Sequence, residues 1–305
     1  MATPVPAVLD LDIPGEDLAR KTVFIKLRLG VFGNSRKVST AQVEVDADKT
    51  LIRVSKSILD SPELEAVRRL DSEIRRFLYT TCLPFDTGVH LLPIGLIESV
   101  ETKLCEFESK RQELVDEFIA AYPTLCQEAA ARLRTLHNPL DYPPSDEVKS
   151  RFRCAWQYVS YGVPDQLKAV SERMFQDERD KAAQLMSEAY TEVRQVLREA
   201  MAELVSHLRD RLADQPDGKP QRLRESTVQK LRDFLDTFDF RNVTDDQELK
   251  EQVGRARQLL AGNTTDAIRN TSELRARVRA GMEEIAQRLG TMTSERVSRK
   301  FRFQE

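Results

Sequence analysis

Residues Asp165 to Asp214 form a run of 50 residues without a single glycine or proline. The run carries 11 acidic and 8 basic side chains among regularly spaced apolar ones, a pattern typical of an amphipathic helix. At about 1.5 Å of rise per residue, one helix of this length would extend roughly 75 Å. The run therefore predicts a molecule built largely from long helices.

The apolar residues of this run are unevenly distributed. Gln176 to Lys181 is almost entirely polar, whereas two apolar stripes begin near Leu185. The stripes consist of Leu185, Ala189, Val193, Val196, Ala200 and Leu204, and of Met186, Tyr190, Leu197, Met201 and Leu208. Because a face that wide contacts more than one helix, we expect the second half to be bundled. The first half should be a solvent-exposed, partner-seeking arm.

Composition restricts the class of protein. Charged residues make up 32% of the chain and aromatic residues only 7%, which is typical of long helices rather than of two compact cores. The formal net charge of −3 implies no global attraction to nucleic acid or to an anionic membrane. No segment approaches the ~18 uninterrupted apolar residues of a membrane helix. We therefore expect a cytoplasmic protein without a membrane partner.

The cysteines do not suggest a metal cluster or a disulfide framework. Cys82, Cys105, Cys126 and Cys154 form no closely spaced pair. The chain also starts without the basic and apolar regions of an export signal. We expect four buried, reduced thiols.

The N-terminal region predicts strands. After a flexible arm over residues 1–20, apolar residues alternate from Val23 to Val31, the period of two expected for a strand with one buried face. Gly33-Asn34 marks a turn. The alternation returns at Ala41 to Val45, and a third strand is expected at Leu51 to Val54. Residues 21–60 are thus predicted to form a small antiparallel β-sheet.

A helix start follows at Ser61-Pro62-Glu63, where a capping side chain, a proline and an acid agree. This helix should end near Thr80. Cys82 to Leu96 is charge-poor and interrupted by proline and glycine, so we expect a buried extended connection. A strand at Val89 to Leu92 should join the N-terminal sheet.

The next helix has the clearest heptad pattern in the chain, in steps of three and four. Its seam is Ile97, Val100, Leu104, Phe107, Arg111, Leu114 and Phe118. Burial of the six apolar side chains of this seam contributes about 1.5 to 3 kcal/mol each, which does not offset the roughly 1 to 2 kcal/mol per residue of backbone entropy lost on helix formation. The seam therefore predicts a coiled-coil contact with a partner helix. Pro123 should interrupt the helix, which resumes from Leu125 to Leu136.

The rest of the chain is predicted to be helical. Residues 61–214 should form a long-helix bundle or coiled coil, residues 215–223 a hinge, and residues 224–305 a C-terminal helical segment with a basic tail. Its helices are expected at Arg224 to Phe238, at Asp245 to Ala261 with Thr244 and Gln247 as a capping box and Gly262 as C-cap, and at Ser272 to Leu289. The tail, Arg296 to Phe303, ends in an alternation suited to a strand that adds to a sheet edge.

No motif predicts catalysis, a metal or a cofactor. His90, His137 and His207 lack companion ligands at metal-binding spacing. The segment from Gly30 to Lys37 contains glycines and a lysine but not the spacing of a phosphate-binding loop, and we interpret it as a hairpin turn. We therefore predict that the chain is not an enzyme.

One cluster leaves two interpretations open. Ser145 should cap a helix that ends in aromatic residues beside an arginine: Phe152, Arg153, Trp156, Tyr158 and Tyr161. These rings either fill the junction between the sheet and the base of the long helix, which we favour, or stack on nucleobases. In the second case Arg296, Arg299, Lys300 and Arg302 of the tail would contact phosphate.

Four segments between residues 54 and 164 resemble a known group of proteins: VSKSILDSPEL, CLPFDTGVHLLP, YPPSDEV and FRCAWQYVSYGVP. They are similar to an uncharacterised family of the domain-of-unknown-function type from bacteria and bacteriophages. Some relatives of that family are encoded beside MoxR-type AAA+ ATPases and von Willebrand factor A proteins. The resemblance implies a client or adaptor of such an ATPase, and it supplies no catalytic residues.

Together these patterns predict a mainly α (α+β) fold, with a small N-terminal antiparallel sheet followed by an elongated long-helix coiled coil or bundle. The predicted function is a non-enzymatic interaction or scaffold protein that binds a protein partner or forms an oligomer. Nucleic-acid binding through the basic tail is the alternative. A third hypothesis, membrane insertion through CLPFDTGVHLLPIGL, is less favoured, because a buried connection explains that segment with fewer assumptions.

Overall fold

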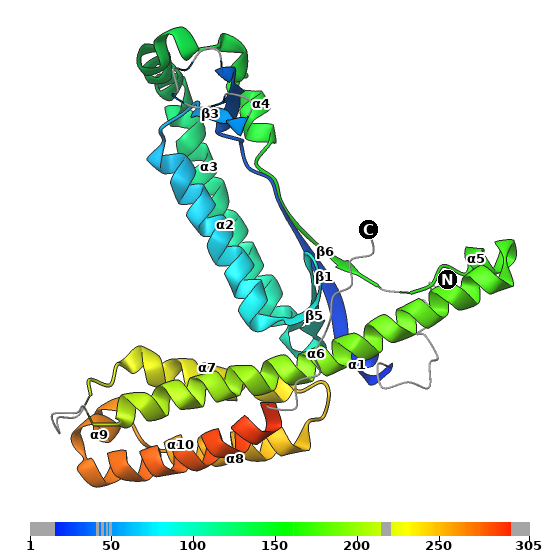
Figure 1. The fold of residues 1–305 in the computed structure, drawn as a ribbon, viewed down its shortest axis with the longest axis vertical. Helices are drawn as coiled ribbons and strands as arrows, with labels where there is room; N and C mark the ends of the chain where they lie inside the picture. The colour runs from blue at the N-terminus through cyan, green and yellow to red at the C-terminus, as the bar shows by residue number, and fades with distance from the viewer. Residues whose placement is uncertain are drawn as a thin grey trace.

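The computed structural model describes residues 16–40, 43, 46, 48, 51–160, 162–214 and 221–293. Figure 1 shows two elongated parts that meet at an angle. One is a hairpin of α2 (Pro62–Thr81) and α3 (Ile97–Leu133) with a sheet beside it, and the other is α6 (Glu172–Leu212) with a helical bundle at one end. The fold is mainly helical with small antiparallel sheets near the N-terminus, as predicted.

The main sheet is antiparallel, with the strand order β4-β5-β1-β6. Its strands are β1 (Thr22–Leu29), β4 (Leu83–Asp86), β5 (Val89–Pro93) and β6 (Cys154–Val159). Ile25 of β1 lies opposite His90 of β5 on one side and opposite Tyr158 of β6 on the other. The predicted strand at Val89 to Leu92 is confirmed, and β1 is its partner.

Because successive side chains of a strand point to opposite faces, those of β1 pack in two different cores. Ile25 is fully buried with Ile74 of the hairpin, whereas Phe24 belongs to a second core with Met186 and Val193 of α6. The sheet therefore lies between the hairpin and the long helix and joins the two parts. The short helix α1 (Glu16–Lys21) precedes β1 and contacts α6.

A separate two-stranded sheet consists of β2 (Ser35–Val38) and β3 (Val54–Ser57). The prediction of one continuous sheet is wrong here, because β1 pairs with β5 and β6 rather than with β2. The segment from Gly30 to Lys37 consequently connects two sheets through residues 30–34, enters β2 at Ser35, and is not a hairpin turn. Most of the strand expected at Ala41 to Val45 lies outside the described residues.

Gly30 is required where β1 ends. A Cβ atom at this position would lie 2.5 Å from the carbonyl oxygen of Arg151, and the Gly30 N–H donates to the carbonyl oxygen of Arg153 at 2.8 Å. The close backbone approach brings the segment that precedes β6 against β1 and sets their register.

The hairpin helices begin as predicted, but α3 is longer than expected. Ser61 Oγ accepts a hydrogen bond from the Leu64 N–H at 3.1 Å, and Pro62 is the first residue of α2. Pro123 lies inside α3, so the predicted interruption is wrong. The φ of proline fits a helix, and the packing of α3 against α2 and α4 offsets the one missing N–H.

The stretch after α3 contradicts the predicted helix that ends in aromatic residues. It contains η4 (Arg134–Leu136), η5 (Pro139–Asp141) and the short helix α4 (Ser145–Ser150). Trp156 and Tyr158 lie in β6 instead. They alternate with Ala155 and Gln157, a period of two that favours a strand, as do the aromatic rings themselves.

The 50-residue run is two helices rather than one. The helix α5 (Gln166–Val170) ends at Ser171, whose backbone is extended at φ −163° and ψ 116°. Ser171 Oγ accepts from the Met174 N–H at 3.3 Å and caps the start of α6. A run without glycine or proline is broken here by an N-cap serine.

The bundle packs against the second half of α6. Its helices are α7 (Glu225–Arg241), α8 (Gln247–Leu260), α9 (Thr265–Asn270) and α10 (Ser272–Thr293). The predicted capping box is wrong, because Asp246, not Thr244, accepts from the Leu249 N–H at 3.2 Å. Gly262 follows α8 with φ +68°, as expected for a C-terminal glycine. Residues 215–220 of the predicted hinge lie outside the described residues.

Candidate interaction site on helix α3

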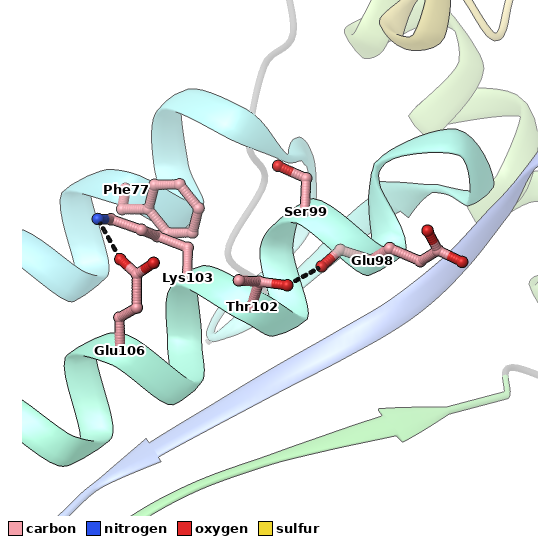
Figure 2. A pocket seen from close by; sticks show the side chains of 6 residues that line it. All are labelled: Phe77, Glu98, Ser99, Thr102, Lys103 and Glu106. Atoms are coloured by element: carbon pink, nitrogen blue, oxygen red, sulfur yellow. Dashed lines mark hydrogen bonds and ion pairs between the residues drawn. The ribbon is translucent and has the colours of Figure 1, made fainter.

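Two adjoining hollows lie on the first half of α3, and they share Glu98, Thr102 and Glu106. The smaller, of about 420 Å³, lies between α3 and Phe77 of α2 (Figure 2). The larger, of about 760 Å³, extends along the same helix. Both are open surfaces, which fit a protein segment better than a small molecule.

Three of the polar side chains that line the smaller hollow, those of Thr102, Lys103 and Glu106, are paired within the chain. Lys103 Nζ lies 2.6 Å from Glu106 Oε2 and 5.3 Å from the centre of the Phe107 ring. Thr102 Oγ1 donates to the carbonyl oxygen of Glu98 at 2.8 Å, as Figure 2 shows. These contacts position the side chains of Thr102, Lys103 and Glu106.

The larger hollow is acidic. Its lining consists of Glu98, Glu101, Thr102, Cys105, Glu106 and Ser109, without a basic residue. Glu101 Oε2 accepts two hydrogen bonds from β6, from Trp156 Nε1 at 2.8 Å and from the Tyr158 hydroxyl at 2.6 Å. Burial, together with the Glu101 carboxylate, raises the pKa of Tyr158. Three carboxylates thus lie along this surface.

The predicted aromatic cluster is divided between two places. Trp156 packs among the residues between the sheet and the hairpin, so the junction that it fills is with α3 and not with the long helix. Phe152 lies 5.5 Å from the ring of Phe118 in a different core. Tyr161 lies outside the described residues, as do the tail residues Arg296, Arg299, Lys300 and Arg302. A nucleobase at Trp156 would bring phosphate close to Glu101.

The heptad seam finds its partner within the same chain. Val100, Leu104 and Phe118 are buried, and α2 packs along α3. Ile97, Phe107 and Leu114 are half-buried beside the core that contains Val100 and Leu104, whereas Phe118 lies in the separate core with Phe152. The seam is thus satisfied without a second molecule.

Arg111, the one charged residue of the seam, lies opposite Asp71 of α2. Arg111 Nε is 2.6 Å from Asp71 Oδ1, and Arg111 Nη2 donates to the carbonyl oxygen of Gly30 at 2.6 Å. The two side chains are 3% and 4% exposed. The prediction did not include Asp71, although it stands at a seam position of α2, four residues after Val67 and three before Ile74.

A second charged centre, also missed by the sequence analysis, ties α6 to the bundle. Asp246 accepts from Arg198 Nε at 2.6 Å and from Arg194 Nε at 3.0 Å. Arg198 also donates to Glu248 at 2.8 Å and to the carbonyl oxygen of Met292 at 3.4 Å. Burial opposes ionisation of Asp246, but the two arginines and the Leu249 N–H outweigh it and hold the pKa of Asp246 below its ordinary value.

The cysteines and histidines show no reactive centre. All four cysteines are free, but only Cys82 is buried and Cys105 is exposed, so the prediction of four buried thiols is wrong for three of them. Burial raises the pKa of Cys82 to about 12, against the opposing effect of Arg241. Among the described residues, no group of histidine, cysteine and carboxylate side chains is placed to hold a metal ion. Within the same residues, no helix is long and apolar enough to cross a membrane.

Comparison with known proteins shows the family and leaves the activity open. The family model described as "Protein of unknown function (DUF3150)" matches residues 20–240. Because the match covers more than half of the chain, the chain belongs to this family, and the predicted resemblance to a domain-of-unknown-function family is confirmed. No curated protein and no solved structure matches the chain.

Proposed function

We propose that this member of the DUF3150 family is a non-enzymatic interaction protein that presents α5 and the first half of α6 to a protein partner. We call this segment, residues 166–185, the arm; it is distinct from the predicted N-terminal arm of residues 1–20. The main body of the protein, in this proposal, holds the arm away from the bundle and from the hairpin.

The observation that carries the proposal is the contrast between the two halves of α6. From Glu172 to Leu185 no residue is buried, whereas from Met186 onward buried residues recur every three to four positions. They are Met186, Ala189, Val193, Leu197, Met201, Val205, Leu208 and Leu212. In Figure 1 the arm extends beyond the sheet and away from the bundle.

The arm has the surface expected for binding a helix or a groove. Val170 is 78% and Met174 50% exposed, and both lie at the end of the arm near Ser171. Exposed methionine beside another apolar residue is common at adaptable protein contacts. Local pairs such as Lys181 with Glu178 keep the arm helical, at a few tenths of a kcal/mol each.

The partner class that we propose is a MoxR-type AAA+ ATPase, with this chain as its adaptor or client in a bacterium or phage. This choice follows from the relatives that the sequence resembles. Self-association through the arm is the competing form of the same proposal, and the mass of the complex distinguishes the two.

Two acidic substitutions on the arm test the proposal. Val170→Asp with Met174→Asp removes the exposed apolar contacts, and we expect it to weaken binding of a purified MoxR-type ATPase from the same host at least about tenfold, a loss of about 1.4 kcal/mol. Co-elution with light scattering measures the complex, and sedimentation equilibrium without the ATPase measures self-association.

The matched control is Leu140→Asp, because Leu140 is 89% exposed but lies in the hairpin part of the molecule. This variant should bind like the unchanged chain. If the arm variant and the control both keep full binding, the arm is not the contact surface. If the unchanged chain neither binds the ATPase nor self-associates, the interaction proposal fails as a whole.

Nucleic-acid binding through the basic tail stays the alternative prediction. Fluorescence anisotropy with single-stranded and duplex DNA at two salt concentrations tests it, because phosphate contacts weaken steeply with salt. Salt-dependent binding that is lost in Arg299→Ala with Arg302→Ala would favour this alternative.

A further inference from the structure

The strand β6 has an uncovered edge. Among the described residues it pairs only with β1, on one side, and it is the last strand in the order β4-β5-β1-β6. Ala155, Gln157 and Tyr158 are exposed, the last at 43%. An open aromatic edge is a template for another strand, and proteins usually cover it.

The surface beside this edge is acidic. Glu101 accepts hydrogen bonds from both Trp156 and Tyr158, so a carboxylate lies on the face of β6 that is turned towards α3. Glu98 lines the same hollow, as does Glu106, which is already paired with Lys103 of the adjoining hollow. A strand that adds here would need basic residues on its α3 side.

We propose that the C-terminal tail of this same chain, residues 299–303, adds to the sheet as a strand along the open edge of β6. The tail sequence from Arg296 to Phe303 is RVSRKFRF, with four basic residues and no acid. Its last residues alternate basic and aromatic, as a strand with two unlike faces requires. The inference is independent of the function proposed for the arm.

The end of α10 lies within reach of this edge. Arg198 bonds the carbonyl oxygen of Met292, so the chain leaves the bundle beside the middle of α6. Val159, at the foot of β6, packs against the core that contains both Met186 of α6 and Met292, near the end of α10. Six residues, 294–299, span about 20 Å when extended.

The direction and the register of the proposed strand both place its basic side chains beside Glu101. β6 runs towards α6, so a tail that starts near α6 and runs along β6 is antiparallel to it. Lys300 beside Tyr158 and Arg302 beside Trp156 would then lie on the face that carries Glu101. A shift by one residue would exchange the two faces and place Phe301 against the carboxylates.

Hydrogen–deuterium exchange on the full chain tests the pairing directly. In the unchanged chain the β6 amides that do not bond β1 should be protected, and Arg302→Glu should accelerate their exchange at least about tenfold. The matched control is Arg299→Glu, the same charge change on the opposite face, which should accelerate it much less. Equal effects of the two variants, or no effect of either, would overturn the proposal.

A charge exchange provides a second test. Glu98→Lys in the Arg302→Glu chain should restore at least part of the protection, because the reversed charges attract again. Glu98 is suitable since it lines the acidic hollow and makes no hydrogen bond to β6. Without any recovery, the placement of Arg302 on the acidic side is wrong.

A shortened chain that ends at Thr293 distinguishes the chain's own tail from other possible occupants of the β6 edge. A labelled peptide of residues 295–305 should bind this shortened chain and bind the full chain at least about tenfold more weakly, because the tethered tail competes. Circular dichroism verifies that the shortened chain is folded. Equal binding of the peptide to the two chains would contradict the proposal. A full chain that is dimeric, with a shortened chain that is monomeric, would also contradict it, because the tail would then pair with β6 of a second copy.

Discussion

The ion pair between Asp71 and Arg111 shows how one residue pair determines the packing of the hairpin. Both side chains are almost fully buried, and Arg111 also binds the backbone at Gly30, where β1 ends. The pair therefore links α2, α3 and the sheet. Removal of one partner leaves a buried charge without compensation, which typically costs about 3 to 5 kcal/mol.

Asp71→Ala should accordingly lower the free energy of unfolding by about 3 kcal/mol or more. Urea denaturation measures the loss. Glu73→Ala, two residues further on the exposed face of α2, is the control and should change stability by less than about 0.5 kcal/mol. Similar losses of unfolding free energy in the two variants would mean that the Asp71–Arg111 pair does not stabilise the hairpin specifically.

Asp246 predicts how stability depends on pH. Its pKa is lower in the folded state than in the unfolded chain, so its contribution is present above the unfolded pKa of about 3.9 and is lost as the pH falls through the folded pKa. Asp246→Asn should therefore destabilise the protein at pH 7, and the difference from the unchanged chain should shrink below about pH 4. Urea midpoints at pH 7, 5 and 3 measure this.

Asp245→Asn is the neighbouring control for that series. Asp245 pairs with Lys21 at the surface, and its side chain is 66% exposed. Such pairs contribute about 0 to 1 kcal/mol. A pH dependence in Asp245→Asn as large as in Asp246→Asn would show that the effect is not specific to the buried carboxylate.

At the scale of elements, the sequence pattern predicted those helices and strands whose start or buried face is determined by neighbouring residues. The capped start of α2 and the strand β5 are both correct, because each depends on nearest neighbours and on one buried face. β6 was missed, although Trp156 and Tyr158 alternate with their neighbours, because the helix start at Ser145 was extended through them and the partner strand β1 lies more than 120 positions earlier. The acidic hollow was missed for the same reason: Glu101 becomes a site residue only when β6 lies beside it.

Ser171 is the element-scale feature that sequence reasoning underestimated. Its extended backbone and its bond to the Met174 N–H separate α5 from α6. Ser171→Ala removes this cap and should cost about 1 kcal/mol locally. We expect faster amide exchange in α5 and in the first turn of α6, with β6 and the bundle unchanged.

Thr191→Ala is the control on the same helix, because the Thr191 hydroxyl bonds the Ser187 carbonyl oxygen within α6 and caps nothing. It should leave exchange in the arm unchanged. Equal acceleration in both variants would show that the arm responds to any small change in α6 and not to the loss of the cap.

At the scale of the whole molecule, the sheet, the helix α1 and a close contact at Gly95 hold the two parts together. The two faces of the sheet belong to two cores, one with the hairpin and one with α6. Gly95, between β5 and α3, lies so close to Phe240 of α7 that a Cβ atom there would be 2.4 Å from the ring. The parts are therefore joined at their meeting point, and their far ends extend freely.

The proposed function depends on this extended shape, and small-angle X-ray scattering with in-line light scattering tests it most directly. A compact domain of 305 residues has a radius of gyration of about 19 Å. For the monomer we predict a radius well above that value and a maximum dimension above about 60 Å, the length of α6 alone. A monomer with a radius near 19 Å and a maximum dimension below 60 Å would contradict the account.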